Sequence, residues 1–295
     1  MLDIRFPIIA APMFLVSNPE MMVAVGEAGG LGTMPALNAR TTEAFREALR
    51  AVKARTNAPF GVNLILLGNP RLREDLAVCL DERVPLLITS LGDPTEVIAA
   101  AHEAGTRVFC DVVNVRHAQK AKAAGADALV AVAHGAGGHA GTISSTVLVP
   151  WLKREVGLPV VAAGGLADGA SLAASLALGA GAGYFGTRFI ASTEAPVGDD
   201  FKQAICAASP EDIVYTPDVT GHPANFLKDS LAQWRERGAD GGSDLKKWRD
   251  VWSAGQTVGL IETTKPCAEI VADIMAEYEA VRAGLPGFAG AALQA

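Results

Sequence analysis

Short apolar runs rich in Val, Ile and Leu recur along the chain of 295 residues at intervals of roughly 20 to 30 residues. Each run is followed by an amphipathic stretch, so the chain reads as a series of strand–helix units. The eight runs are PIIAAPM from Pro7, LGTMPA from Leu31, PFGVNLILL from Pro59, LLITSL from Leu86, RVFCDVV from Arg107, ALVAVAH from Ala128, PVVAAGG from Pro159 and GAGYFGTRF from Gly181. Eight such units predict an α/β protein with a closed (β/α)₈ TIM barrel.

Local signals support the alternation of strands and helices. The stretch after Ala39 begins with a Thr cap and Glu43, and the stretch that begins at Asp93 ends at Gly105. A doubly wound open sheet would also contain strand–helix repeats, but its glycine-rich phosphate turn usually follows the first strand. Here the glycines follow the seventh and eighth strands, where barrels bind phosphate, and this favours the barrel.

The pattern changes after Phe189. We expect residues 1–196 and 253–285 to form the barrel, and residues 197–252 to form an appended helical insertion or lid. Within the insertion, GADGGSDLKKW is expected to be a flexible connector. CAEIVADIMAEYEAVRAG is expected to be a closing amphipathic helix of the barrel.

Composition narrows the function classes. A formal net charge of −7 and the absence of a Lys/Arg-rich run argue against nucleic acid as a partner. Four scattered cysteines without a CxxC pair fit reduced thiols, so we expect a cytoplasmic protein without a bound metal. The apolar start of the chain contains Pro7 and Pro12 and is too short and interrupted to span a bilayer, which predicts a buried first strand and no membrane partner.

Two glycine motifs predict a phosphate site. AAGG ends the seventh run at Gly164 and Gly165, and the eighth run ends in Gly186 and Thr187. Phosphate oxygens can approach bare backbone N–H groups only where no side chain intervenes, and Thr adds a hydroxyl. We therefore expect the chain to bind a phosphorylated cofactor.

His139 is the candidate catalytic residue. It lies in AHGAGGHAG, just past the sixth strand, at the end of the barrel where active sites occur. The neighbouring glycines keep the loop free of bulk, and imidazole is the side chain best suited to move protons near neutral pH. The alternative is a histidine that hydrogen-bonds within a glycine loop for structural reasons.

Two further residues are candidates for contact with a ligand. Asn63 is a polar residue inside an apolar strand, so its amide pairs either with neighbouring backbone or with a ligand at the end of the strand. Met13, which follows Pro12, could offer a flat apolar surface to a heterocycle, although a plain core methionine fits the sequence nearly as well.

The ordered set of motifs resembles the nitronate monooxygenase (2-nitropropane dioxygenase-like) family of FMN-dependent barrels. The motifs are APM near the start, AGGLGT at 28–33, PFGVNL at 59–64, AGGHAG at 136–141, AAGGLADG at 162–169, GTRF at 186–189 and WSAGQTVGLI at 252–261. The resemblance covers nearly the whole chain. It implies a flavoprotein with FMN as cofactor and a small-molecule nitronate or nitroalkane as substrate together with O₂; a homodimer is one assembly that we consider.

The resemblance also implies roles for individual residues. The FMN phosphate would lie against Gly164, Gly165, Gly186 and Thr187, and the substrate would face His139 as the catalytic residue. The remaining residues expected to bind the cofactor are Pro12, Met13 and Asn63 near the ring, Asp111, Gly137, Gly138 and Ala163, and Gln256, which would close the site. Asp111 is a departure, because several relatives have a lysine near the flavin at this place.

The expected reaction is the FMN-dependent oxidation of an alkyl nitronate by O₂ to a carbonyl compound and nitrite. His139 would remove the α-proton of a neutral nitroalkane or hold the nitronate. The alternative is an NAD(P)H-dependent reductase of quinones or enoyl thioesters on the same flavin. A third hypothesis is a barrel that binds a phosphorylated metabolite as a sensor, with a structural His139.

Overall fold

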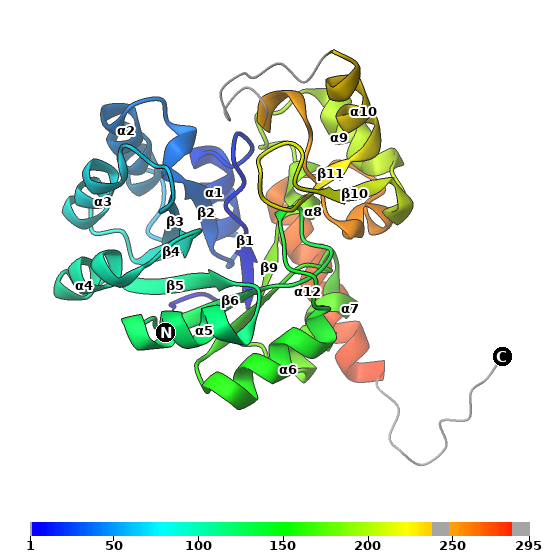
Figure 1. Cartoon of the computed structure of the whole chain (residues 1–295). Coiled ribbons are helices and arrows are strands. Elements are labelled where there is room, and N and C mark those ends of the chain that lie inside the picture. The colour runs from blue at the N-terminus through cyan, green and yellow to red at the C-terminus, as the bar shows by residue number, and fades with distance from the viewer. Residues whose placement is uncertain (1, 238–247, 285–295) are drawn as a thin grey trace.

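The computed structural model describes residues 2–237 and 248–284, and within them eight parallel strands form the predicted barrel (Figure 1). The strand order is β1-β9-β8-β6-β5-β4-β3-β2, and the parallel bridge between Ile9 and Leu31 brings β1 next to β2. The strands are β1 (Ile8–Ala10), β2 (Gly32–Pro35), β3 (Phe60–Ile65), β4 (Leu86–Ser90), β5 (Arg107–Val112), β6 (Ala128–Val132), β8 (Val160–Ala163) and β9 (Ala182–Phe185). All eight apolar runs therefore contain a barrel strand, and the predicted fold is confirmed.

Helices follow the strands and cover the outside of the barrel. They are α1 (Pro19–Glu27), α2 (Thr42–Lys53), α3 (Leu72–Asp81), α4 (Thr95–Glu103), α5 (Val115–Ala124), α6 (Ser145–Val156), α7 (Gly169–Ala177), the short α8 (Thr187–Ile190) and the closing α12 (Cys267–Gly284), with the 3₁₀ turns η1 (Ala36–Asn38) and η3 (Gln256–Leu260). Side-chain caps set several starts: Asn18 and Asn114 accept hydrogen bonds from the first turns of α1 and α5, and Asp168 forms a capping box with Ser171. No helix in these two described stretches is long and apolar enough to cross a membrane.

The core has two layers because each strand is buried on both faces. Leu86 and Ile88 of β4 point into the barrel, where they pack with Phe109 and Val130, whereas Leu87 between them packs in the layer under the helices. Burial on both sides explains why the strands read as continuous apolar runs.

Helix α12 closes the barrel against α7 and α1 (Figure 1). At the crossing with α7, a Cβ on Gly169 would lie 2.1 Å from the backbone nitrogen of Tyr278, and Glu277 Oε2 accepts a hydrogen bond from the Gly169 N–H. Only glycine permits this approach. The C-terminal helix predicted from the sequence is confirmed.

The segment predicted as a helical insertion also contains strands, which corrects the expectation of helices and loops. It contains α9 (Asp199–Ala207), η2 (Pro210–Asp212), β10 (Ile213–Thr216), β11 (Ala224–Leu227) and α10 (Lys228–Glu236). Strand β11 pairs with β10 and with β7 (Gly138–His139), which belongs to the loop after β6. IVYT and ANFL are too short to show a clear period, and they are strands because they pair with each other and because ANFL also pairs with β7. Apart from Trp248, the GADGGSDLKKW connector lies outside the described residues.

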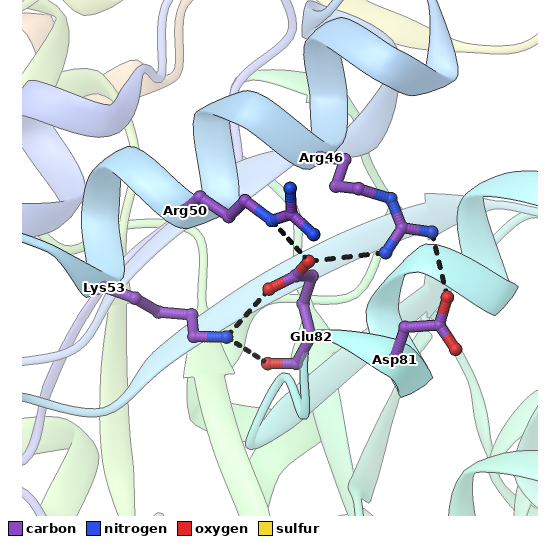
Figure 2. A network of polar contacts seen from close by, with 5 residues as sticks. All are labelled: Arg46, Arg50, Lys53, Asp81 and Glu82. Carbon is purple, nitrogen blue, oxygen red and sulfur yellow. Dashed lines mark hydrogen bonds and ion pairs between the residues drawn. The ribbon is translucent and has the colours of Figure 1, made fainter.

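A polar cluster joins α2 to the end of α3 (Figure 2). Because Glu82 lies between the end of α3 and the start of β4, the cluster is at the N-terminal face of the barrel, opposite the strand ends that carry the glycine motifs. Glu82 Oε1 accepts hydrogen bonds from Arg50 Nε at 2.8 Å and Arg46 Nη1 at 3.3 Å, and Lys53 Nζ lies 2.8 Å from Oε2. The Glu82 side chain is only 8% exposed. Lys53 and Arg50 hold the pKa of Glu82 well below its usual 4.5, at about 2.

Replacement of this carboxylate is expected to weaken the fold in a pH-dependent way. Glu82→Gln is expected to lower the free energy of unfolding at pH 7 by about 1–3 kcal/mol. Because the folded pKa lies below the unfolded one, the stabilisation is present above about pH 4.5 and is lost as the pH falls towards 2. Urea unfolding at pH 7, 5 and 3 checks this, with Glu155→Gln in the exposed Arg154 pair as a control that changes little. A difference between wild type and Glu82→Gln that stays constant over this range contradicts the expectation.

Candidate active site

The turn after β8 leaves open space above bare backbone. Gly164 and Gly165 have φ angles of +93° and +85°, in the left-handed region that favours glycine. A Cβ on Gly164 would lie 2.9 Å from the Ala133 carbonyl oxygen, whereas the nearest atom to a Cβ on Gly165 is Ser145 Oγ at 3.9 Å. Within the described part of the chain, no residue accepts a hydrogen bond from the Gly165 N–H. Gly164 is thus required by the neighbouring loop, and Gly165 leaves room for a ligand.

Thr187, the first residue of α8 just after β9, lies beside the segment that precedes α12. Its Oγ1 accepts a hydrogen bond from the Gly255 N–H at 2.9 Å, and the residue is 6% exposed. Because that oxygen is already an acceptor, the hydroxyl proton is available to a ligand oxygen. Gln256 N donates to the Gly135 carbonyl at 3.0 Å, so the tail segment also reaches the loop after β6.

The glycine loop after β6 packs closely on these neighbours. Ala133 N donates to the carbonyl of Ala163, the last residue of β8, at 2.9 Å. A Cβ on Gly137 would lie 2.9 Å from Gly255 N, and one on Gly138 would lie 3.8 Å from the Trp248 ring. The carboxyl ends of β6, β8 and β9 and the tail therefore meet at one end of the barrel, as the sequence predicts.

The loop after β1 lies beside the end of β9. A Cβ on Gly186 would lie 3.9 Å from Met13 Sδ, which places Met13, next to Pro12, near the second glycine motif. Asn38 holds this loop, because its Nδ2 donates to the carbonyls of Met13 at 3.1 Å and Ser17 at 2.7 Å. Asn38 could not be predicted from the sequence, because it is a single amide in a 3₁₀ turn with no motif around it.

Three polar side chains on consecutive strands form a hydrogen-bonded row at the top of the barrel interior. Asn63 Nδ2 donates to the Ile88 carbonyl at 3.1 Å and to Ser90 Oγ at 2.8 Å, and Ser90 Oγ donates to Asp111 Oδ2 at 2.5 Å. Both amide protons of Asn63 are thus bound by protein, and only its carbonyl oxygen remains for a ligand. Ser90 was missed, although its position two residues after the inward-facing Ile88 predicts the same orientation.

Two buried polar atoms near this row have no partner among the described residues. They are Asp111 Oδ1 and the hydroxyl of Tyr184, which lies on β9 and faces the barrel interior. Burial raises the pKa of Asp111 from 3.8 to about 6, against the effect of the Ser90 hydrogen bond. Burial, and secondly the Asp111 charge, raise the pKa of Tyr184 well above its usual value.

Removal of the Asp111 charge is expected to stabilise the fold above pH 6. The folded pKa exceeds the unfolded one, so the carboxyl favours folding at low pH, and the wild type loses stability as the pH rises from about 4 to 6. Asp111→Asn removes this loss and is expected to raise the free energy of unfolding at pH 8 by about 1–3 kcal/mol relative to wild type. Urea unfolding at pH 5 and pH 8 measures it. Equal pH dependence in both proteins would show that Asp111 is not the group responsible.

His139 belongs to a strand that the insertion holds in place. Strand β7 pairs with β11, with His139 opposite Ala224 and Gly138 opposite Asn225. Asn225, which is 2% exposed, donates from Nδ2 to the Ala136 carbonyl at 2.7 Å and so fixes the glycine loop. The sequence placed His139 correctly past β6 but predicted neither its short strand nor Asn225.

The environment of His139 keeps its imidazole neutral. Its ring makes edge contacts with Trp248 at 5.3 Å and His222 at 6.0 Å between ring centroids, and its Nε2 lies 3.2 Å from Thr220 Oγ1. Burial, and secondly His222, lower the pKa of His139 from 6.5 to about 4. At pH 7 the ring therefore carries a free lone pair that can accept a proton. In the ranges 2–237 and 248–284, no group of three or more His, Cys, Asp or Glu side chains could hold a metal ion.

The fold is a (β/α)₈ barrel, and the candidate site lies at the ends of β6, β8 and β9. The sequence profile of the nitronate monooxygenase family matches residues 1–75 and 66–240. The chain belongs to the nitronate monooxygenase family, as its motifs predict, and it is a flavin-dependent oxidoreductase.

Individual relatives support this assignment. A nitronate monooxygenase of Paraburkholderia phytofirmans is 31% identical over 281 residues, which cover 78% of this chain and 76% of that protein. An octahydroindene-carboxyl-CoA dehydrogenase of Mycobacterium tuberculosis is 34% identical over 242 residues, 81% of this chain and 68% of that protein. Among solved structures, FabK from Thermotoga maritima has a TM-score of 0.88 and 35% sequence identity over 96% of both chains. Nitroalkane oxidase from Streptomyces ansochromogenes has a TM-score of 0.86 and 29% sequence identity, over 96% of this chain and 99% of that one.

Proposed function

We propose that the protein uses FMN to oxidise alkyl nitronates with O₂ to a carbonyl compound and nitrite. The observation that carries the proposal is the position of His139, in the loop after β6 that packs against the Gly164 turn at the carboxyl end of a flavin-family barrel. Burial lowers the pKa of its imidazole to about 4, which favours the neutral form at pH 7. The names of the nitronate monooxygenase and nitroalkane oxidase relatives support this substrate class.

The residues present fit FMN. The open space at Gly165, its N–H, which has no acceptor among the described residues, and the Thr187 hydroxyl suit phosphate oxygens. The unpartnered oxygens of Asp111 and Tyr184 suit the polar edge of a flat heterocycle. In this proposal Gly164, Gly165, Gly186 and Thr187 hold the phosphate, while Pro12, Met13, Asn63 and Asp111 lie near the ring and Gly137, Gly138, Ala163 and Gln256 enclose the cofactor. Bound FMN would supply the two-electron chemistry.

The protein's own groups then bind the substrate and move a proton. A neutral His139 can take the α-proton of a nitroalkane, and the resulting imidazolium can hold the anionic nitronate by charge. Trp248 and His222 contact the ring edge to face, and the partial burial of His139 strengthens that attraction.

Two measurements test the proposal. The purified protein should be yellow and release FMN on denaturation, and anaerobic addition of a nitronate should bleach the flavin. A colourless protein that cannot be reconstituted with FMN would overturn the cofactor assignment. A flavin that no nitronate or nitroalkane reduces would overturn the substrate assignment.

A second candidate is favoured by the CoA-ester relative from Mycobacterium tuberculosis. On the same flavin, an NAD(P)H-dependent reductase would act on enoyl thioesters or quinones. Anaerobic bleaching by NADH or NADPH supports it, whereas reduction by a nitronate alone supports the oxidation of nitronates.

The expected partners are therefore the small-molecule substrate and O₂.

The four cysteines Cys79, Cys110, Cys206 and Cys267 are all free thiols. Free thiols are typical of a reducing compartment and support a cytoplasmic location. A reporter fused to the chain and assayed in cell fractions tests this placement.

A further inference from the structure

The hydroxyl of Thr220 is shared between His139 and the backbone of the same turn. Thr220 Oγ1 donates a hydrogen bond to the His222 carbonyl at 3.1 Å and lies 3.2 Å from His139 Nε2. A threonine hydroxyl has one proton, and a carbonyl oxygen can only accept. With this proton donated to the carbonyl, Thr220 presents a lone pair towards His139, and Nε2 supplies the hydrogen between the two side chains.

We propose that Thr220 is a positioning residue that fixes His139 in the tautomer protonated at Nε2 and so makes Nδ1 the proton-accepting nitrogen. A neutral imidazole carries one N–H, so protonation at Nε2 leaves the lone pair on Nδ1. In the described residues, no protein group hydrogen-bonds His139 Nδ1, which leaves that atom for a substrate. The catalytic part of this inference rests on the proposed function, in which His139 is the base.

The surroundings hold both partners in this arrangement. Thr220 lies in the turn between β10 and β11, and β11 pairs directly with the strand of His139. Trp248 and His222 contact the imidazole with their planes at 75° and 77° to it, which restricts rotation of the ring. The insertion thus supplies the group that orients the base, as carboxylates and carbonyls do for catalytic histidines elsewhere.

The tautomer can be read directly by NMR on the flavin-loaded protein. With ¹⁵N-labelled histidine, two-bond proton–nitrogen spectra at pH 7.5 distinguish protonated from unprotonated ring nitrogens, and His139→Asn assigns the signals among the five histidines. We expect a protonated Nε2 and an unprotonated Nδ1 in the wild type. A protonated Nδ1 in the wild type overturns the inference without any variant.

Substitutions test the role of the hydroxyl. Thr220→Val should mix the two tautomers and lower kcat/KM on neutral nitroalkanes by roughly 10- to 100-fold, less than loss of the base itself. Thr220→Ser should keep the single tautomer and the wild-type kcat/KM, because serine retains the hydroxyl. Thr216→Val is the matched control, since the Thr216 hydroxyl accepts a hydrogen bond from Asp218 N in the same turn and does not contact His139. If Thr220→Val does not fold, Thr220→Ala replaces it.

The outcomes separate this inference from the proposed function. An unchanged His139 tautomer in Thr220→Val overturns the positioning role. A second outcome is that the tautomer of His139 changes in Thr220→Val and returns in Thr220→Ser while His139→Ala leaves nitroalkane activity intact. That combination confirms the assignment of the proton and overturns His139 as the base.

Discussion

Gly165→Asp is expected to abolish retention of FMN. The nearest atom to a Cβ at this position is 3.9 Å away, so an aspartate side chain fits and extends into the space assigned to the phosphate. There it would overlap the phosphate and repel its negative charge. We expect the affinity for FMN to fall by more than about 100-fold, which corresponds to about 2.7 kcal/mol. The absorbance ratio of flavin to protein after gel filtration, and titration of the apoprotein with FMN, measure the loss.

Two matched variants separate charge from backbone strain. Gly157→Asp adds the same charge at a φ of +75°, also in open space, but at the end of α6 that leads into β8, on the opposite face of the barrel. It should retain FMN. Gly165→Ala adds the strain of a side chain at φ +85° without charge and should weaken binding less than aspartate does. Full flavin content in Gly165→Asp would place the phosphate elsewhere.

The barrel was predictable because its signal is repeated eight times. Each parallel strand is buried on both faces, so it leaves a continuous apolar run, and each helix leaves caps such as Asp168. The end of the eighth strand could not be predicted from the apolar pattern, because Thr187–Ile190 continue that pattern but form a short helix after β9. Strands β10 and β11 left no comparable signal, because they pair with each other and with a two-residue strand contributed by a distant loop.

In the candidate site, the sequence predicted the positions at which the backbone geometry requires glycine. Gly164 has both a left-handed φ and a backbone atom within 3 Å of its missing Cβ, and such a requirement appears in the sequence as a motif. Ser90 and Tyr184 follow no motif, because their role depends on which strands lie next to each other in the barrel. Thr220 lies 81 residues from His139, and pairing of β11 with β7 brings them together.

The polar groups of the candidate site come from two parts of the chain, the barrel and the insertion. The barrel ends present the glycine turns and the polar row of Asn63, Ser90 and Asp111, whereas the insertion contacts the candidate base through Thr220, Ala224 and Trp248. A change in the insertion could therefore alter the chemistry at His139 and leave cofactor binding intact.

His139→Ala is expected to remove most activity on neutral nitroalkanes while FMN content stays at the wild-type level. Loss of a general base typically costs about 10² to 10⁴-fold in rate. Activity on a preformed nitronate should fall less, because that substrate has already lost its α-proton. His139→Asn should behave in the same way, since an amide can replace a hydrogen bond but not the basic nitrogen. Steady-state rates on both substrates, with flavin content measured for each variant, provide the comparison.

The ratio of the two losses decides the role of His139. His117→Ala, at an exposed position on α5, is the control and should leave both rates unchanged. Because the His139 imidazole titrates near pH 4, the wild-type rate on neutral nitroalkanes should be constant above about pH 5 and should fall as the pH drops through 4, where protonation removes the lone pair. Equal and small losses on both substrates would show that His139 is not the base. A loss of folded protein in both His139 variants would instead assign this side chain to the packing of β7 against β11 and Trp248, the structural role that the glycine loop also permits.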